Sequence, residues 1–182
     1  TTPSYVFTTD EAGTITTNIS EGFSSSASAA IGSNTVTFDI LGEGTYASKT
    51  VTVTDASGNA SSLTLTTFVV DTTAPTGAIT YSAASPYKQG ATATVTATFT
   101  EALTTTPKIA ISGVSSVAAT NMTSTGSANI WTYAYTAPAG NGTDTFAFSV
   151  GTDTSGNVVT AAPTSGATVT VDNTSPAMII TA

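Results

Sequence analysis

The feature that most constrains the fold is a pair of turn signatures that occurs twice, in the same order. Thr54–Asn59 reads T-D-A-S-G-N, and Thr152–Asn157 reads T-D-T-S-G-N. Each is followed by a β-rich stretch and then by a second signature. This second signature is V-D-T-T-A-P at Val70–Pro75 and V-D-N-T-S-P at Val171–Pro176. Self-similarity of this kind indicates tandem structural units.

The chain also opens with Thr1-Thr2-Pro3, which looks like the tail of one more junction. Three junctions then bracket two modules of unequal length. We expect a short module over residues 1–72 and a second over residues 73–175. Residues 176–182 would begin a following module or form a terminal strand. No leader sequence is visible and the chain does not begin with Met, so we expect a mature product or part of something longer.

Strands are expected wherever apolar and polar residues alternate with a period of two. In the first module these stretches are residues 5–9, 14–18, 34–40, 45–54 and 61–70. In the second module they are residues 77–81, 91–99, 107–112, 116–120, 129–136, 143–150 and 167–171.

Alternation also predicts which side chains share a face of a strand. In the first module the expected core-facing residues are Val51 and Val53 on one strand, with Leu63, Leu65 and Val69 on the next. In the second module one face carries Trp131, Tyr133 and Tyr135, and another carries Phe146, Phe148 and Val150.

Short strands with turns every eight to twelve residues are typical of immunoglobulin-like sandwiches. Gly44-Thr45-Tyr46, early in a late strand, resembles a tyrosine corner, in which the Tyr hydroxyl bonds back to the backbone. The fold class predicted is all-β, with two tandem immunoglobulin-like Greek-key β-sandwiches joined by a short linker. The Cys–Trp–Cys core of antibody domains is missing, since the chain has no Cys.

Charge excludes several classes of function. The chain has 3 Lys and Arg against 11 Asp and Glu, for a net charge of -8. Nothing here could neutralise a nucleic-acid backbone or favour an anionic membrane surface. The absence of Cys and His removes thiol catalysis, the usual zinc sites and Ser-His-Asp chemistry. No apolar run is long enough for a membrane-spanning helix. We therefore expect neither an enzyme nor membrane insertion.

The S-G-N hairpin, the Thr-Val strands and the V-D-x-T-x-P junction, taken together, resemble the bacterial immunoglobulin-like tandem repeats of large surface adhesins and biofilm-associated proteins. The resemblance covers essentially the whole chain. It implies an extracellular, cell-surface location and an adhesive or stalk function. The implied partners are neighbouring modules of the same parent chain and a host-cell, glycan or biofilm ligand. It also implies Ca²⁺ at module junctions.

Sandwich topology brings four of the oxygen-bearing side chains together at the junction between the modules. Asp71 arrives on the linker, Glu101 ends the second strand, and Asp153 and Asn157 occupy the last hairpin. No Lys or Arg lies close to them in sequence, and Ca²⁺ accepts six to eight such oxygens. The competing interpretation is ordinary turn chemistry, because Asp and Asn bond their own backbone and Gly permits positive φ.

The same reasoning gives two incomplete metal sites. The N-terminal one would comprise Asp10, Glu11, Asp55 and Asn59, and the C-terminal one Asp172. Asp144, near the opposite end of its module, is expected to be a solvated turn residue.

Two alternative functions stay open at this point. One is a self-assembling filament or surface-layer subunit, in which residues 167–171 or the apolar residues 177–180 complete a neighbour's sheet. The other is a glycan- or protein-binding module, for which Tyr81 and Tyr87 are the available exposed aromatic candidates, although both are expected to be packing residues.

Overall fold

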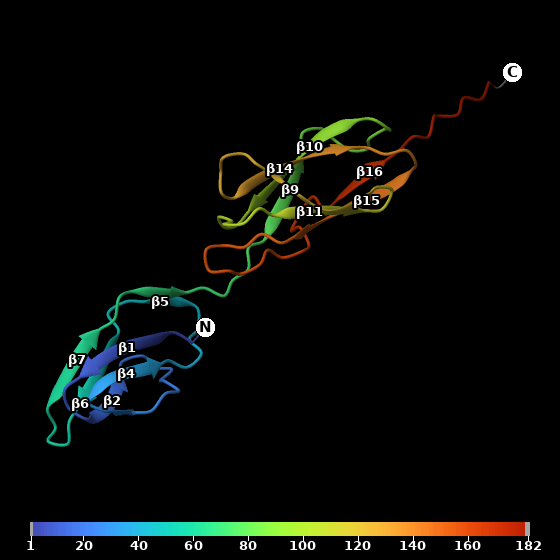
Figure 1. Cartoon of the computed structure of the whole chain (residues 1–182). Coiled ribbons are helices and arrows are strands. Elements are labelled where there is room, and N and C mark those ends of the chain that lie inside the picture. Colours follow the sequence, from blue (N-terminus) through green and yellow to red (C-terminus); the bar gives the residue numbers. More distant parts are fainter. Residues whose placement is uncertain (1, 181–182) are drawn as a thin grey trace. The chain divides into compact units, whose positions relative to one another are not determined.

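A computed structural model describes residues 2–180 of the chain (Figure 1). Every regular element among these residues is a β-strand, which confirms the all-β prediction. Within the same residues no helix is long and apolar enough to cross a membrane. The chain falls into two compact units divided after Thr72, which we call unit 1 and unit 2.

Over residues 2–72, unit 1 contains eight short strands arranged in three sheets. Its sheet orders are β1-β4, β3-β2-β6-β7 and β5-β8. The strands are β1 (Ser4–Thr9), β2 (Gly13–Thr17), β3 (Ser28–Ala29), β4 (Gly32–Thr37), β5 (Gly44–Tyr46), β6 (Thr50–Thr54), β7 (Ala60–Thr64) and β8 (Phe68–Val70).

The core of unit 1 draws side chains from all three sheets, as expected for a layered β fold. Ile15 of β2, Val36 of β4 and Val51 of β6 are buried in one cluster. The rings of Tyr46 and Phe68 stack at 5.0 Å between centroids, which joins β5 to β8. Each buried aliphatic or aromatic side chain of this kind stabilises the fold by about 1.5–3 kcal/mol.

The two long strands expected over residues 45–54 and 61–70 are each broken into two. Ser48 adopts φ of 53°, a left-handed conformation that ends β5 and lets β6 begin in another sheet. The partner strand divides at the same level, so β5 pairs with β8 while β6 pairs with β7. The predicted core positions Leu63 and Val69 are therefore wrong, and these side chains are 53% and 65% exposed. Leu65 is buried as predicted.

The tyrosine corner predicted at Tyr46 is confirmed by its hydrogen bond. The Tyr46 hydroxyl donates to the Gly42 carbonyl at 3.0 Å. Unit 2 has an equivalent contact, in which the hydroxyl of Tyr87 donates to the carbonyl of Ala83. Tyr87 is buried, in agreement with a packing role.

The described part of unit 2, residues 73–180, contains two four-stranded antiparallel sheets. Their orders are β13-β14-β10-β9 and β12-β11-β15-β16. The strands are β9 (Gly77–Tyr81), β10 (Thr92–Phe99), β11 (Lys108–Ser112), β12 (Ser116–Asn121), β13 (Thr123–Ser124), β14 (Ile130–Thr136), β15 (Gly142–Ser149) and β16 (Thr168–Val171). Except for the short β13, each of these strands begins and ends within one residue of the bounds expected from the sequence.

The core of unit 2 follows the predicted alternation closely. Trp131 and Tyr135 of β14 are buried, and so are Phe146 and Phe148 of β15. Val150 departs from the pattern, because φ of 61° turns the chain before this residue could continue the inward face. It is consequently 47% exposed.

Asp144 is the clearest correction to the sequence analysis. It is fully buried in β15 instead of solvated in a turn. Its carboxylate accepts hydrogen bonds from the backbone N–H of Ser115 at 2.6 Å, from the Ser115 hydroxyl, and from the Tyr135 hydroxyl at 2.8 Å. Gly113 permits this approach, since a Cβ there would lie 2.0 Å from the carbonyl oxygen of Thr143. The three donors explain how the core tolerates a buried acid.

We predict that Asp144→Ala lowers the free energy of unfolding of unit 2 by about 3 kcal/mol, because it leaves several buried donors without an acceptor. Tyr135→Phe removes one donor and should cost about 1 kcal/mol. Urea unfolding followed by the fluorescence of Trp131, the only Trp in the chain, measures both. Equal losses for the two variants would contradict a carboxylate that serves three donors.

Candidate metal centre

The site predicted in unit 2 is organised around the hairpin Asp153–Asn157. The Asp153 Oδ1 accepts the backbone N–H groups of Ser155 at 2.7 Å and Asn157 at 2.9 Å. Its Oδ2 accepts the side-chain amide of Asn157 at 2.9 Å. Gly156 has φ of 90°, which a residue with a side chain rarely adopts. The sequence T-D-x-S-G-N is thus a self-contained turn.

Unit 1 repeats this hairpin almost atom for atom. The Asp55 Oδ1 accepts the backbone N–H groups of Ser57 and Asn59, both at 2.8 Å. Its Oδ2 accepts the Asn59 side-chain amide at 2.8 Å, and Gly58 also has φ of 90°. The turn chemistry weighed in the sequence analysis is therefore present in both copies.

Hydrogen bonds of the hairpin also set the charge state of its aspartate. Burial by itself raises the pKa of Asp153, but the Asn157 side chain and the backbone N–H groups of the turn outweigh it and hold the pKa below its usual range. For Asp55 the Asn59 side chain is the largest contributor, and that pKa is lowered as well. Both side chains are therefore carboxylates at neutral pH.

Glu101 is brought to the Asp153 hairpin by threonines in its own loop. The hydroxyl of Thr104 donates to the carbonyl of Asp153 at 2.8 Å, and the Thr104 N–H donates to the carbonyl of Thr152 at 2.7 Å. The hydroxyl of Thr105 accepts the N–H of Thr152 at 2.8 Å. Neither threonine is among the residues predicted from the sequence, because a hydroxyl that bridges two loops follows no spacing rule.

The segment that leads into β9 is attached to the same end of unit 2. The N–H of Thr76 donates to the Thr100 hydroxyl at 3.0 Å, and the Thr100 N–H returns a bond to the carbonyl of Thr76. The N–H of Thr160 donates to the carbonyl of Pro75. Asp71 lies upstream in this connecting segment, directly after β8.

Three of the four predicted ligands come together. Asp71, Glu101 and Asp153 each offer a carboxylate oxygen, and these atoms all lie within 4.8 Å of one another. Asp153 is buried, and the other two are half-buried. Asn157 contributes its side-chain amide to Asp153, as described above.

Carboxylate oxygens this close to one another could be ligands of a single metal ion. Oxygen ligands lie 2.3–2.6 Å from Ca²⁺, so two ligands of one ion are separated by at most about 5 Å.

The residues of the predicted N-terminal site also meet. Asp10, Glu11, Asp55 and Asn59 line one depression of about 150 Å³ in unit 1. Asp10 and Glu11 directly follow β1, whereas Pro3 immediately precedes it, so the chain enters β1 at the opposite end from these acids. Among the described residues, these carboxylates do not form a group of three whose oxygen atoms all lie within 4.8 Å of one another, as Asp71, Glu101 and Asp153 do.

Asp172, the predicted C-terminal ligand, lies just after β16 and is exposed. One of its carboxylate oxygens accepts the N–H of Thr174 at 2.8 Å, and its own N–H donates to the carbonyl of Tyr87. It therefore closes the turn at the start of the second V-D-x-T-x-P signature.

A comparison of the chain with protein-family models found no match, and a comparison with curated proteins found no similar sequence.

We predict that Asn157→Ala raises the pKa of Asp153 toward its ordinary value, because the variant loses the side-chain donor. Because folding lowers this pKa, the ionised carboxylate stabilises the native hairpin at pH values above its ordinary pKa near 3.9. This stabilisation is lost as the pH falls through the pKa of the folded state. Carboxyl ¹³C NMR titration measures the shift. Asn59→Ala should act on Asp55 in the same way, whereas Asn121→Ala, an exposed change on β12, should leave both pKa values unaltered.

Proposed function

We propose that this chain is a structural or adhesive segment of an extracellular bacterial surface protein, a stalk of immunoglobulin-like modules stiffened by Ca²⁺ at the junctions. The observation that carries the proposal is the convergence of Asp71, Glu101 and Asp153 within 4.8 Å. The proposed role is mechanical and includes no catalytic step.

The strand pairing supports an immunoglobulin-like Greek-key arrangement for each unit. In unit 2, β10 pairs with β14 and β11 pairs with β15, so neighbours in the sheets are distant in sequence. Unit 1 has the matching pairs β1 with β4 and β2 with β6. The tyrosine corner at Tyr46 is a further feature of this class.

Calcium would act on the connecting segment. Asp71 is supplied by that segment, whereas Glu101 and Asp153 are held by loops of unit 2. Without a cation, three carboxylates this close repel one another, since two unit charges 4 Å apart interact by about 4 kcal/mol at an effective dielectric constant of 20. A bound Ca²⁺ replaces this repulsion by attraction and restrains the segment. Pro75, which is buried, limits the remaining backbone freedom.

Surface composition supports the proposed location and partners. Charged residues make up only 8% of the chain, and outward positions of the strands are largely Thr and Ser. The expected neighbours are further modules of the same parent chain, with a host-cell, glycan or biofilm component as the adhesive ligand.

We predict that millimolar Ca²⁺ raises the melting temperature of unit 2, followed by Trp131 fluorescence, relative to excess chelator. At one hundred times the dissociation constant the ion stabilises the native state by about 2.7 kcal/mol. Asp71→Asn and Glu101→Gln should remove this increase. In chelator the same variants should melt at or above the wild-type temperature, because each relieves carboxylate repulsion.

Two controls sharpen this experiment. Asp10→Asn removes an exposed carboxylate of unit 1 and should leave the Ca²⁺ effect on Trp131 intact. Mg²⁺ at the same concentration should stabilise less, because of its shorter coordination distance. Superimposable melts in Ca²⁺ and chelator would reject the calcium site and leave the acidic loops as turns.

A further inference from the structure

The two units share the main part of one strand plan. The pairs β1-β4, β2-β3, β2-β6 and β5-β8 of unit 1 match β10-β14, β11-β12, β11-β15 and β15-β16 of unit 2. Even the register corresponds, since Gly44 pairs with Val70 and Gly142 with Val171. Within residues 2–72 no strand corresponds to β9.

In unit 2, β9 is bonded along both of its edges. On one side it pairs with β10, from Gly77 opposite Phe99 to Tyr81 opposite Val95. On the other side the N–H of Ile79 donates to the carbonyl of Ser165 at 3.0 Å. Ile79 is 3% exposed. This strand therefore closes the unit between β10 and the segment that precedes β16.

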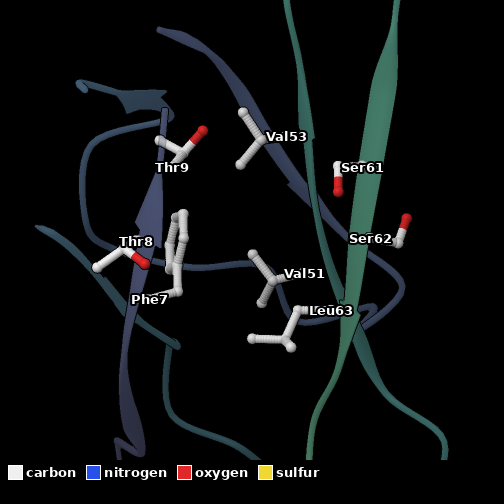
Figure 2. Close-up of a pocket in the computed structure, with 8 residues that line it drawn as sticks. All are labelled: Phe7, Thr8, Thr9, Val51, Val53, Ser61, Ser62 and Leu63. Carbon is white, nitrogen blue, oxygen red and sulfur yellow. The ribbon is translucent and has the colours of Figure 1, made fainter. Parts of the chain in front are cut away.

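The corresponding place in unit 1 is an open groove (Figure 2). It has a volume of about 390 Å³. Figure 2 shows Phe7 of β1 on one side and Val51, Val53 and Leu63 of β6 and β7 on the other. Thr8, Thr9, Ser61 and Ser62 complete the lining, which contains no charged residue. Strands β1 and β7 each have a named strand partner on one edge only.

We propose that this groove is a strand acceptor, and that its occupant is the apolar segment Ala177–Ile180 of a second copy of the chain. The segment follows Pro176 of the second V-D-x-T-x-P signature, just as β9 follows Pro75 of the first. Within the described residues it belongs to no strand, and Met178, Ile179 and Ile180 are 92%, 87% and 93% exposed. An added strand gains main-chain hydrogen bonds at the sheet edge and apolar contacts at alternate positions.

Side-chain sizes in the groove complement this segment. In unit 2, the small Gly77 lies against the large Phe99, where a Cβ would approach the ring to 2.8 Å. Glu11 stands two residues after the end of β1, and Glu101 stands two residues after the end of β10. When the two glutamates are aligned, Thr9 takes the position of Phe99. Counting from the two junction prolines, Met178 takes the place of Gly77. A small residue on the acceptor thus meets a large one on the added strand, the reverse of the arrangement in unit 2.

The next inward position is filled in the same way. Ile79 of β9 lies opposite Ala97 of β10. The corresponding pair is Ile180 with Phe7, whose ring leaves less space than Ala97 but presents more apolar surface. Ile179, between the two inward positions, points to the other face by strand alternation. The inward pair therefore consists of Met178 and Ile180.

Such a contact joins two different surfaces of the chain, the groove of unit 1 and the segment Ala177–Ile180. Head-to-tail contacts of this kind extend into linear assemblies unless they form a ring. Because each copy carries a net charge of -8, assembly should strengthen as salt screens repulsion between copies.

Sedimentation of the whole chain in excess chelator tests the proposal independently of calcium. The mean mass is expected to rise with protein concentration and with salt. Ile180→Asp and Leu63→Asp should each hold the chain at the mass of one copy. Both positions are exposed in the single chain, so neither change removes a buried contact. Ile179→Asp and Val69→Asp are matched controls on the same segment and the same unit, and both should still assemble.

Mixing the two disabled variants gives a decisive result. Ile180→Asp keeps an intact groove and Leu63→Asp keeps an intact segment, so the mixture should form one-to-one dimers and nothing larger. A wild-type chain that stays monomeric throughout would overturn the proposal. If it stays monomeric while a synthetic peptide of residues 76–82 shifts the NMR signal of Leu63, the groove accepts another strand, and a second copy is rejected as its occupant.

Discussion

The hydrogen bonds between an aspartate and the asparagine four residues later underlie the organisation of both units. They hold Asp55 and Asn59 in unit 1, and Asp153 and Asn157 in unit 2, in the same closed turn. In unit 1 this turn sets the register of β6 against β7. In unit 2 it presents an ionised carboxylate to the loop after β10. The hydrogen bonds that close the turn in unit 2 therefore also position the acidic group on which the candidate metal centre depends.

Much of this fold is predictable because its strands alternate cleanly. The expected stretch 77–81 has the same bounds as β9, and Trp131 and Tyr135 share the inward face of β14 as alternation requires. The failures occur where the backbone leaves the extended region. Ser48 and Val150 have positive φ, and Leu63, Val69 and Val150 are exposed as a result of the changes in strand direction nearby. These conformations depend on tertiary contacts and leave no pattern in the sequence.

The candidate site shows the same division between pattern and context. Asp71, Glu101 and Asp153 could be brought together from strand order alone, because the loop after the second strand and the last hairpin lie at one end of a sandwich. The part played by Thr104 was not foreseen, since a hydroxyl that bridges two loops has no spacing rule. Asp144 was misjudged for a different reason. It stands two residues before Phe146, on the inward face, so alternation identifies it as buried, whereas the prediction followed its place near the end of the module.

The single-sided pairing of β1 has a mechanical consequence. Its six residues are hydrogen-bonded to β4 alone among the named strands, and antiparallel bonds run perpendicular to the strand axis. A pull along that axis therefore strains all of these bonds together, whereas a pull across it opens them one at a time. The corresponding strand of unit 2, β10, is bonded along both edges and shares an axial load between β9 and β14. In a longer array under tension, β1 would therefore transmit an axial load to the rest of unit 1 through its bonds to β4.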